Sequence, residues 1–208
     1  MKSSPSSIYS NPFILLLCVL GLLSGCNWVG LASVSSSGEV ADRGAGSPSL
    51  SVDGRYIAFD SGATNLVPND ITGEQDIFVR DLREGVTNRI SVGATAGIEA
   101  NSHSYVPKIS GDGQYVAFFS HADNLVDDDT NDTTDVFVHD RESGMTSLVS
   151  VNSSGIQGNR QNESPSISAD GRFVSFTSTS TNLADNDTNA TWDVFVHDRE
   201  TGETRCVS

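Results

Sequence analysis

Two loops of this sequence carry acidic or amide side chains at every second position. In each loop, oxygen-bearing side chains fall at positions one, three, five and nine. Asp-x-Asp-x-Asn loops with this spacing can converge on a single hard cation such as Ca²⁺. The spacing predicts structural calcium sites that stiffen the loops. The predicted ligands are Asp127, Asp129, Asn131 and Asp135 in one loop and Asp185, Asp187, Asn189 and Asp193 in the other.

Turn chemistry explains the same residues without a metal. Asp, Asn and Thr side chains often cap backbone N–H groups in loops. A related earlier loop has Pro68 at the first position, so one oxygen is lost there. Val138 and Val196 stand where the twelfth position of an EF-hand loop has a bidentate Glu. The sequence therefore leaves calcium binding and structural capping as alternatives.

The other reactive side chains are predicted to be structural. His139 and His197 occupy equivalent places, and Arg80 replaces them in a third, whereas a catalytic histidine is normally unique. Cys206 is expected to be a small buried residue of a strand. The sequence contains no Gly-x-Ser-x-Gly elbow, no His-Glu-x-x-His and no phosphate-binding loop. We therefore predict no catalytic residues and no enzymatic activity.

The loops belong to a unit that the sequence repeats three times. The hexapeptide at 135–140 (DVFVHD) reads DIFVRD 59 residues earlier and DVFVHD again 58 residues later. A fixed period of this length is the signature of a repeat fold. The anchors that recur in step are Pro48, Pro107 and Pro165, the Asp-Gly pairs at 53–54, 112–113 and 170–171, and the Asn-Leu pairs at 65–66, 124–125 and 182–183.

Each unit predicts four antiparallel strands, which in the second unit fall at about 106–110, 115–120, 135–140 and 146–151. The Asp-Gly pair and a later Gly-containing turn are typical of tight hairpins. The Val-Phe-Val run of the hexapeptide is continuously apolar, as expected for a strand that is covered on both faces. We therefore predict an all-β fold of β-propeller blades, each of four antiparallel strands, with almost no helix.

The recurring pattern resembles a known repeat. It reads Pro-x-[IL]-Ser-x-Asp-Gly-[RQ]-[YF]-[IV]-[AS]-Phe, then Asp-[VI]-Phe-Val-x-Asp, then x-x-Gly-x-Thr, and it covers about residues 33–208. This is similar to the TolB-type, WD40-like β-propeller repeat. The resemblance implies a periplasmic protein that works through protein partners, including envelope lipoproteins.

Three blades are too few to close a ring, since propellers typically have about four to eight. The expected blades are residues 35–92, 93–151 and 152–208, as part of a larger propeller of about six to eight blades. The alternative is that two copies of the chain assemble into one ring. Residues 31–34 align with the fourth strand of the first unit, which makes 26–34 a candidate ring-closing segment.

The N-terminus has the features of a bacterial lipoprotein leader. Residues 1–25 contain one charge, Lys2, and an apolar run at 13–23 of signal-peptide length. The run ends in Leu-Ser-Gly-Cys26, which resembles the lipobox, so Cys26 is the expected lipidation site. Acyl chains such as palmitate would anchor the protein in the membrane. The alternatives are an ordinary secretory signal and an uncleaved anchor.

The composition and the N-terminal leader together predict the cellular location and the function of the protein. The formal net charge of −15 makes nucleic acid a poor partner. Asn27 after the cysteine implies sorting to the outer membrane of the cell envelope. We expect a lipid-anchored, non-enzymatic scaffold that binds an envelope protein or peptide and touches the membrane only through its anchor. The alternatives are an accessory propeller domain of a hydrolase or peptidase, and a glycan-binding surface module for which Trp192 is the plausible loop aromatic.

Overall fold

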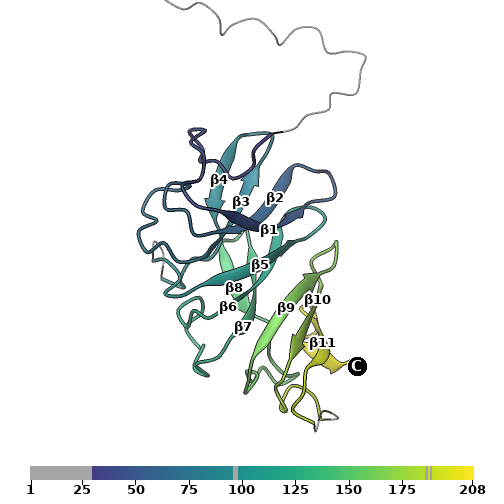
Figure 1. Ribbon diagram of the computed structural model, residues 1–208. Helices are drawn as coiled ribbons and strands as arrows, with labels where there is room; N and C mark the ends of the chain where they lie inside the picture. The colour runs from purple at the N-terminus through teal and green to yellow at the C-terminus, as the bar shows by residue number, and fades with distance from the viewer. Residues whose placement is uncertain (1–29, 96–97, 186, 188) are drawn as a thin grey trace, which may run out of the picture. The chain divides into compact units, whose positions relative to one another are not determined.

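The fold consists of three four-stranded antiparallel sheets, one from each sequence repeat (Figure 1). The computed structural model describes residues 30–95, 98–185, 187 and 189–208. In each sheet the order of the strands in space follows their order in the chain. Blade 1 contains β1 (Ala45–Leu50), β2 (Tyr56–Ser61), β3 (Asp76–Asp81) and β4 (Val86–Arg89); blade 2 contains β5 (Ser104–Ile109), β6 (Tyr115–Ser120), β7 (Asp135–Asp140) and β8 (Met145–Leu148); blade 3 contains β9 (Asn162–Ile167), β10 (Phe173–Ser178), β11 (Asp193–Asp198) and β12 (Glu203–Cys206).

The predicted all-β fold is confirmed, and the described residues contain no α-helix. Consequently, nothing in that part of the chain is a helix long and apolar enough to cross a membrane. The second and third strands of blade 2 have the predicted bounds, whereas its first strand begins two residues earlier than predicted, at Ser104. Its fourth strand ends at Leu148 rather than at residue 151.

A bulge explains why the first strand of blade 2 differs from its predicted bounds, and the same bulge occurs in the other two blades. Ser47, Val106 and Ser164 have positive φ angles of 47°, 53° and 54°, and each directly precedes the recurring proline. The pairing register between the first and second strands shifts at the same place in all three blades. A β-branched residue such as Val106 rarely adopts positive φ, so this geometry is not visible from propensity. The prolines sit at bulges, where no ladder hydrogen bond is needed from their nitrogen.

The third strand of each blade forms the centre of the packing. Every residue of β3 except Arg80 is buried, as is every residue of β7 except Asp140. Phenylalanines paired across the second and third strands stack at 5.7, 5.9 and 5.8 Å between ring centroids in the three blades. Aromatic pairs of this kind add to the stabilisation that burial of their apolar area provides. The prediction of a strand covered on both faces is therefore correct for blades 1 and 2.

Successive blades contact each other through their first turns. The backbone N–H of Val52 donates to the carbonyl of Gly111, whose own N–H donates to the carbonyl of Ala169. Gly113 packs against the ring of Tyr56, and the guanidinium of Arg141 lies 4.2 Å from the centroid of the same ring. Blade 3 repeats this arrangement on Tyr115 of blade 2. The repeated turns thus connect the strands within each blade and also form contacts between successive blades.

The recurring Asn-Leu pairs fix the connections between blades. Leu66, Leu125 and Leu183 are buried. The preceding asparagine, Asn65, Asn124 or Asn182, donates its amide to a carbonyl of the connecting segment at 2.7–2.8 Å. The carbonyl acceptors are those of Val40, Glu99 and Gln157.

Residues 26–29 of the candidate ring-closing segment at 26–34 lie outside the described residues. Within its described part, Val34 forms an isolated bridge with Val40 rather than belonging to a strand. The carbonyl of Val34 accepts a hydrogen bond of 2.6 Å from the hydroxyl of Thr87 in β4. The segment therefore runs beside the fourth strand of blade 1, in the same way that Val151 meets Thr204 of blade 3.

Candidate functional site

Each blade carries an acidic loop between its second and third strands. The loops span residues 62–75, 121–134 and 179–192. They turn back at equivalent residues, Gly73, Asp132 and Ala190, whose φ angles are 65°, 58° and 54°. This left-handed turn directs the loop toward the aspartate that begins the third strand.

A serine holds that aspartate in the same way in every blade. Ser91, Ser150 and Ser208 each donate a hydrogen bond of 2.5–2.6 Å to Oδ1 of Asp76, Asp135 and Asp193, respectively. The same hydroxyls accept the backbone N–H of the residue after the aspartate. In every blade the serine therefore fixes both Oδ1 of the aspartate and the start of the third strand.

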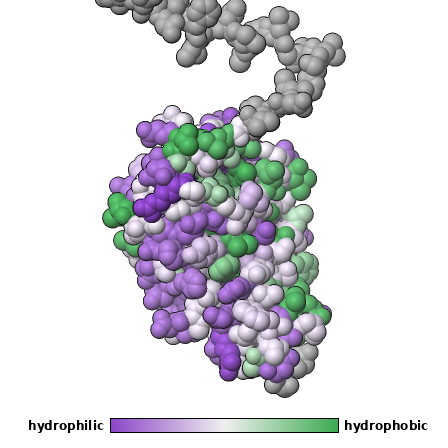
Figure 2. Space-filling view, viewed as in Figure 1, coloured by the Kyte–Doolittle hydropathy of each residue, from purple (hydrophilic) through white to green (hydrophobic). Residues whose placement is uncertain are grey.

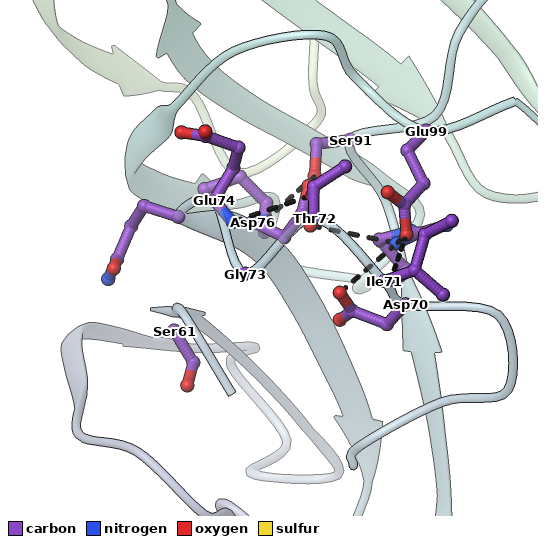
Figure 3. A network of polar contacts seen from close by, with 12 residues as sticks. Ser61, Asp70, Ile71, Thr72, Gly73, Glu74, Asp76, Ser91 and Glu99 are labelled. Atoms are coloured by element: carbon purple, nitrogen blue, oxygen red, sulfur yellow. Dashed lines mark hydrogen bonds and ion pairs between the residues drawn. The ribbon is translucent and has the colours of Figure 1, made fainter. Parts of the chain in front are cut away.

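In blade 1 an arginine from β4 enters the acidic loop. Arg89 Nη1 lies 2.6 Å from Glu99 Oε1, 3.6 Å from Asp76 Oδ2 and 3.7 Å from Asp70 Oδ1. The guanidinium is nearly buried, with 9% of its side chain exposed. Glu99 also accepts the backbone N–H of Ile71, beside Asp70 (Figure 3). Three carboxylates from different parts of the chain therefore converge on one cationic group.

The cluster contains three carboxyl groups and only one guanidinium. The pKa values of the three carboxyl groups are shifted in different directions. Burial raises the pKa of Asp76 to about 7, although Ser91 and Arg89 act in the opposite direction. Burial also raises the pKa of Asp70. For Glu99 burial acts in the same sense, but the hydrogen bonds from Arg89 and Ile71 outweigh it and lower the pKa. Asp76 is thus the group of this cluster that takes a proton near neutral pH.

Blade 2 has both aspartates, Asp129 and Asp135, but has no arginine at the position of Arg89. Leu148 pairs with Phe137, just as Arg89 pairs with Phe78 in blade 1. Amide groups from the segment after β8 approach the carboxylates instead. Asn162 Nδ2 donates to Asp135 Oδ1 at 3.0 Å, and Gln157 Nε2 lies 3.5 Å from Asp129 Oδ1. Burial, followed by the charge of Asp135, raises the pKa of Asp129 to about 6.

Blade 3 has neither the arginine nor the amides. Cys206 pairs with Phe195 and so takes the position of Arg89. Asp187 and Asp193 are buried, with 6% and 9% exposed. The Oδ2 atoms of both carboxylates are enclosed and receive no hydrogen bond from the described residues.

The structure separates the predicted calcium ligands into groups with different surroundings. Asp135, Asp187 and Asp193 are buried and Asp129 is half-buried, whereas Asp127 and Asp185 are exposed. Asp127 and Asp185 line polar hollows between the acidic loop and the adjoining connection. No group of three or more His, Cys, Asp or Glu residues within the described ranges is arranged to hold a metal.

The two predicted asparagine ligands act as caps. Asn131 Oδ1 accepts the backbone N–H of Thr133, and Asn189 Oδ1 accepts that of Thr191. Asn131 also donates its amide to the carbonyl of Gly158. These contacts are those of the turn-capping alternative.

Four residues that shape the site were not identified from the sequence: Arg89, Glu99, Gln157 and Asn162. Arg89, Gln157 and Asn162 lie 13–28 residues from the aspartates that they approach, and Glu99 contacts Arg89. One signal was present. Arg89 interrupts a repeat position that is otherwise occupied by Leu148 and Cys206.

The histidines of the hexapeptide contact threonines of the fourth strand. His139 Nδ1 and Thr146 Oγ1 lie 3.0 Å apart, and His197 Nδ1 and Thr204 Oγ1 lie 2.9 Å apart. Arg80 makes the equivalent contact with Thr87 in blade 1. Burial lowers the pKa of both histidines. Of the remaining predicted residues, Trp192 is half-exposed in its loop, and Cys26 lies outside the described residues.

No protein-family model and no curated protein matches the sequence. Similar solved structures exist. TolB from Acinetobacter baumannii superposes with a TM-score of 0.50 and 19% identity, over 82% of this chain and 33% of that chain. The β-propeller domain of the Trilobed protease from Pyrococcus furiosus gives a TM-score of 0.47 and 16% identity, over 78% of this chain and 41% of that one. Putative TolB from Agrobacterium tumefaciens gives 0.46 and 17%, over 76% and 47% of the two chains.

The chain thus spans about a third of the length of the first of these structures and less than half of the others. At this identity the likeness to TolB from Acinetobacter baumannii concerns the fold. The three sheets correspond to blades of a larger propeller, and the chain is an all-β protein with a distant structural similarity to TolB-like β-propeller domains.

Proposed function

We propose that this protein is a lipid-anchored β-propeller scaffold of the bacterial cell envelope that binds another protein and has no catalytic role. Its membrane contact is the lipid on Cys26, and its binding surface is the outward face of blade 3.

The exposed apolar side chains of blade 3 are the observation that carries this proposal. Val194 is 38% exposed, whereas the residues at the same position of blades 1 and 2, Ile77 and Val136, are 0% exposed. Phe173 and Val207 are exposed on the same blade. In blades 1 and 2 the next blade covers this face, so its shape and apolar character are those of a surface that packs against protein.

The visible side of the molecule is largely hydrophilic (Figure 2). Figure 2 shows that hydrophilic residues cover much of the visible side of the molecule and that hydrophobic residues form scattered patches. An apolar surface with a polar rim is the usual composition of a protein-binding interface.

The titratable groups of the hexapeptides support a role without catalysis. Besides the histidines that contact threonines, the final aspartates are tied to arginines: Asp81 to Arg55 and Asp198 to Arg172, both at 2.7 Å. These contacts recur between blades, and each stabilises a turn. The Leu-Ser-Gly-Cys26 sequence and the resemblance of the repeats to TolB-type propellers support the envelope location.

Photo-crosslinking in intact cells tests the binding role. A photoreactive amino acid placed at Val194 should give an adduct with a distinct envelope protein. The matched control is the same amino acid at Met145, which is more exposed than Val194 but lies on β8 at the edge of blade 2. Equal adducts at both positions, or none at Val194, would contradict the proposal.

Membrane fractionation tests the anchor separately. The wild-type protein should sediment with the outer membrane and incorporate labelled palmitate, and Cys26→Ala should do neither. Retention of the variant in the outer-membrane fraction would show that Cys26 is not the anchor.

A further inference from the structure

We propose that His103 is a pH-sensitive switch at the junction between blades 1 and 2. When its imidazole is neutral, it holds the backbone of Gln75 at the end of the acidic loop of blade 1. When the imidazole is protonated, it releases that backbone and pairs with Glu74. The proposal concerns a junction inside the described chain and does not depend on the protein-binding face of blade 3.

The switch rests on one nitrogen atom that has two partners. The backbone N–H of Gln75 donates to Nδ1 of His103 at 2.9 Å, and Oε2 of Glu74 lies 2.8 Å from the same Nδ1. The N–H group requires a lone pair on Nδ1, whereas an ionised carboxylate, which only accepts, requires a proton there. No single protonation state of the imidazole therefore satisfies both contacts.

The chemistry of the ring sets the order of the two states. Histidine is the side chain that ordinarily changes charge between about pH 5 and 8. The side chains of His103 and Glu74 are 46% and 36% exposed, so water reaches both and can exchange the proton. The pair with Glu74 thus belongs to the acidic end of this range, and the hydrogen bond from Gln75 belongs to the alkaline end.

Other charged and titratable groups surround the imidazole without contacting Nδ1. The ring of Tyr105 lies 5.7 Å from the imidazole between centroids, and His121 donates its backbone N–H to the carbonyl of His103. On the side of blade 1, Asp60 accepts the side-chain amide of Gln75, and Arg43 donates to the carbonyl of residue 73. Among the described residues, the charged side chain that contacts Nδ1 is therefore that of Glu74.

Gln75 belongs to the hydrogen bonds that join blade 1 to blade 2. Its carbonyl accepts the backbone N–H of Ser104, the first residue of β5, at 2.6 Å. Its side-chain amide donates to Oδ1 of Asp60, and Oδ2 of Asp60 accepts the backbone N–H of Val106 at 3.2 Å. Protonation of His103 therefore removes one hydrogen bond from the network that connects the two blades.

The junction between blades 2 and 3 provides an internal control. Its backbone contact is the same, because the N–H of Asn162 donates to the carbonyl of Thr134 at 2.9 Å. His121 contacts the hydroxyl of Thr134 and not its backbone N–H. The residues that replace Glu74, Gln75 and His103 at this junction are Thr133, Thr134 and Gln161, none of which titrates.

NMR of the full chain labelled with ¹⁵N, recorded between about pH 5 and 8, tests the proposal. The amide of Gln75 should gain protection from hydrogen exchange as the pH rises, and its proton resonance should move downfield. The midpoint of this change should equal the midpoint at which the ring nitrogens of His103 titrate. The protection of the Thr134 amide should stay constant over the same range.

Two variants assign the response to the imidazole. His103→Gln copies the residue of the other junction and should abolish the pH dependence at Gln75. Asp76→Asn is the control, because Asp76 follows Gln75 and takes a proton near neutral pH. This variant should retain the response of Gln75.

Three results would overturn the proposal. The first is an amide of Gln75 that does not change with pH in the wild-type chain, a measurement that requires no variant to fold. The second is a midpoint at Gln75 that differs from that of the His103 ring. The third is a response that persists in His103→Gln or disappears in Asp76→Asn, which would assign the pH dependence to the buried aspartate.

Discussion

The side chain at the end of the fourth strand differs between the blades, and the groups that approach the buried aspartates differ as well. Arg89 supplies a guanidinium in blade 1. Leu148 supplies no polar group in blade 2, and amides approach the carboxylates there. The aspartates are held alike in all three blades by a serine, so the blades differ in the other groups that approach the carboxylates. The backbone of the blade is therefore compatible with several forms of charge compensation.

Asp76 should make the stability of the protein depend on pH in a particular window. Its folded-state pKa of about 7 lies above the value of about 3.9 expected in the unfolded chain. Its contribution is fully present below pH 4 and is lost as the pH rises to about 7, because the unfolded state then releases the proton more readily. Asp76→Asn should flatten the fall in unfolding free energy across this window, as measured by urea denaturation at several pH values.

A variant at the surface, Glu84→Gln, serves as the control for the pH dependence that we attribute to Asp76. Glu84 is largely exposed in the turn after β3, so Glu84→Gln should give a curve parallel to that of the wild type. One pKa unit corresponds to about 1.4 kcal/mol, which makes the expected change in slope measurable. A curve for Asp76→Asn that stays parallel to the wild type would show that Asp76 is ionised throughout.

At the scale of elements, much of the fold could be predicted because the information is local. The Asp-Gly pairs set the hairpins, and Gly54, Gly113 and Gly171 have positive φ as those turns require. The bulge at Val106 could not be predicted, because a β-branched residue before proline normally disfavours that backbone.

The candidate site was predicted only in part for a related reason. The spacing of Asp129, Asn131 and Asp135 is a local pattern, and the loop does bring the two aspartates near each other, since the charge of Asp135 contributes to the raised pKa of Asp129. What approaches them, such as Gln157, depends on the packing of a distant segment. The spacing of residues within the loop therefore cannot predict that contact.

The turn glycines differ between blades in a way that permits a matched test. Gly113 has a φ of 78°, and a Cβ added there would collide with the ring of Tyr56 in the preceding blade. Gly54 has a φ of 69° and no atom within 4 Å of such a Cβ. Gly54→Ala should lose about 1–2 kcal/mol of unfolding free energy from backbone strain alone. Gly113→Ala should lose that amount and about 1–3 kcal/mol more, because the blades must separate to admit the methyl group.

Urea denaturation of both variants, fitted with the same dependence of unfolding free energy on urea concentration, compares their losses of stability. Equal losses would mean that the ring of Tyr56 moves aside freely and that the contact between the first turns of blades 1 and 2 contributes little to their association.

On the scale of the whole molecule, the blades form a series in which each covers the face of the one before it. Two of the three buried clusters combine residues from neighbouring blades, blades 1 and 2 in one and blades 2 and 3 in the other. In such a series, stability is approximately the sum of the intrinsic stability of each repeat and of its interfaces. Blade 2 has two interfaces of this kind in the described chain, whereas blade 3 has one.

Hydrogen exchange can measure this difference with the sequence held constant. The segments 135–142 and 193–200 both read DVFVHDRE, so the intrinsic exchange rates of their amides are closely matched. Both form central strands with the same ladder of pairs on each side. They differ in side-chain cover, since Val136 is buried and Val194 is exposed. Because local opening costs less where less apolar surface is buried, the amides of β11 should exchange faster than those of β7.

The result also bears on the proposed binding face. A protein that docks on blade 3 would bury Val194 as blade 3 itself buries Val136, so binding should slow exchange in 193–200 and leave 135–142 nearly unchanged. Equal protection of the two segments in the isolated chain would mean that the ladder alone sets their stability. Exposure of the apolar face would then not lower the stability of blade 3, so a partner that covers the face would not raise it. That result would contradict the proposal that the face binds a protein.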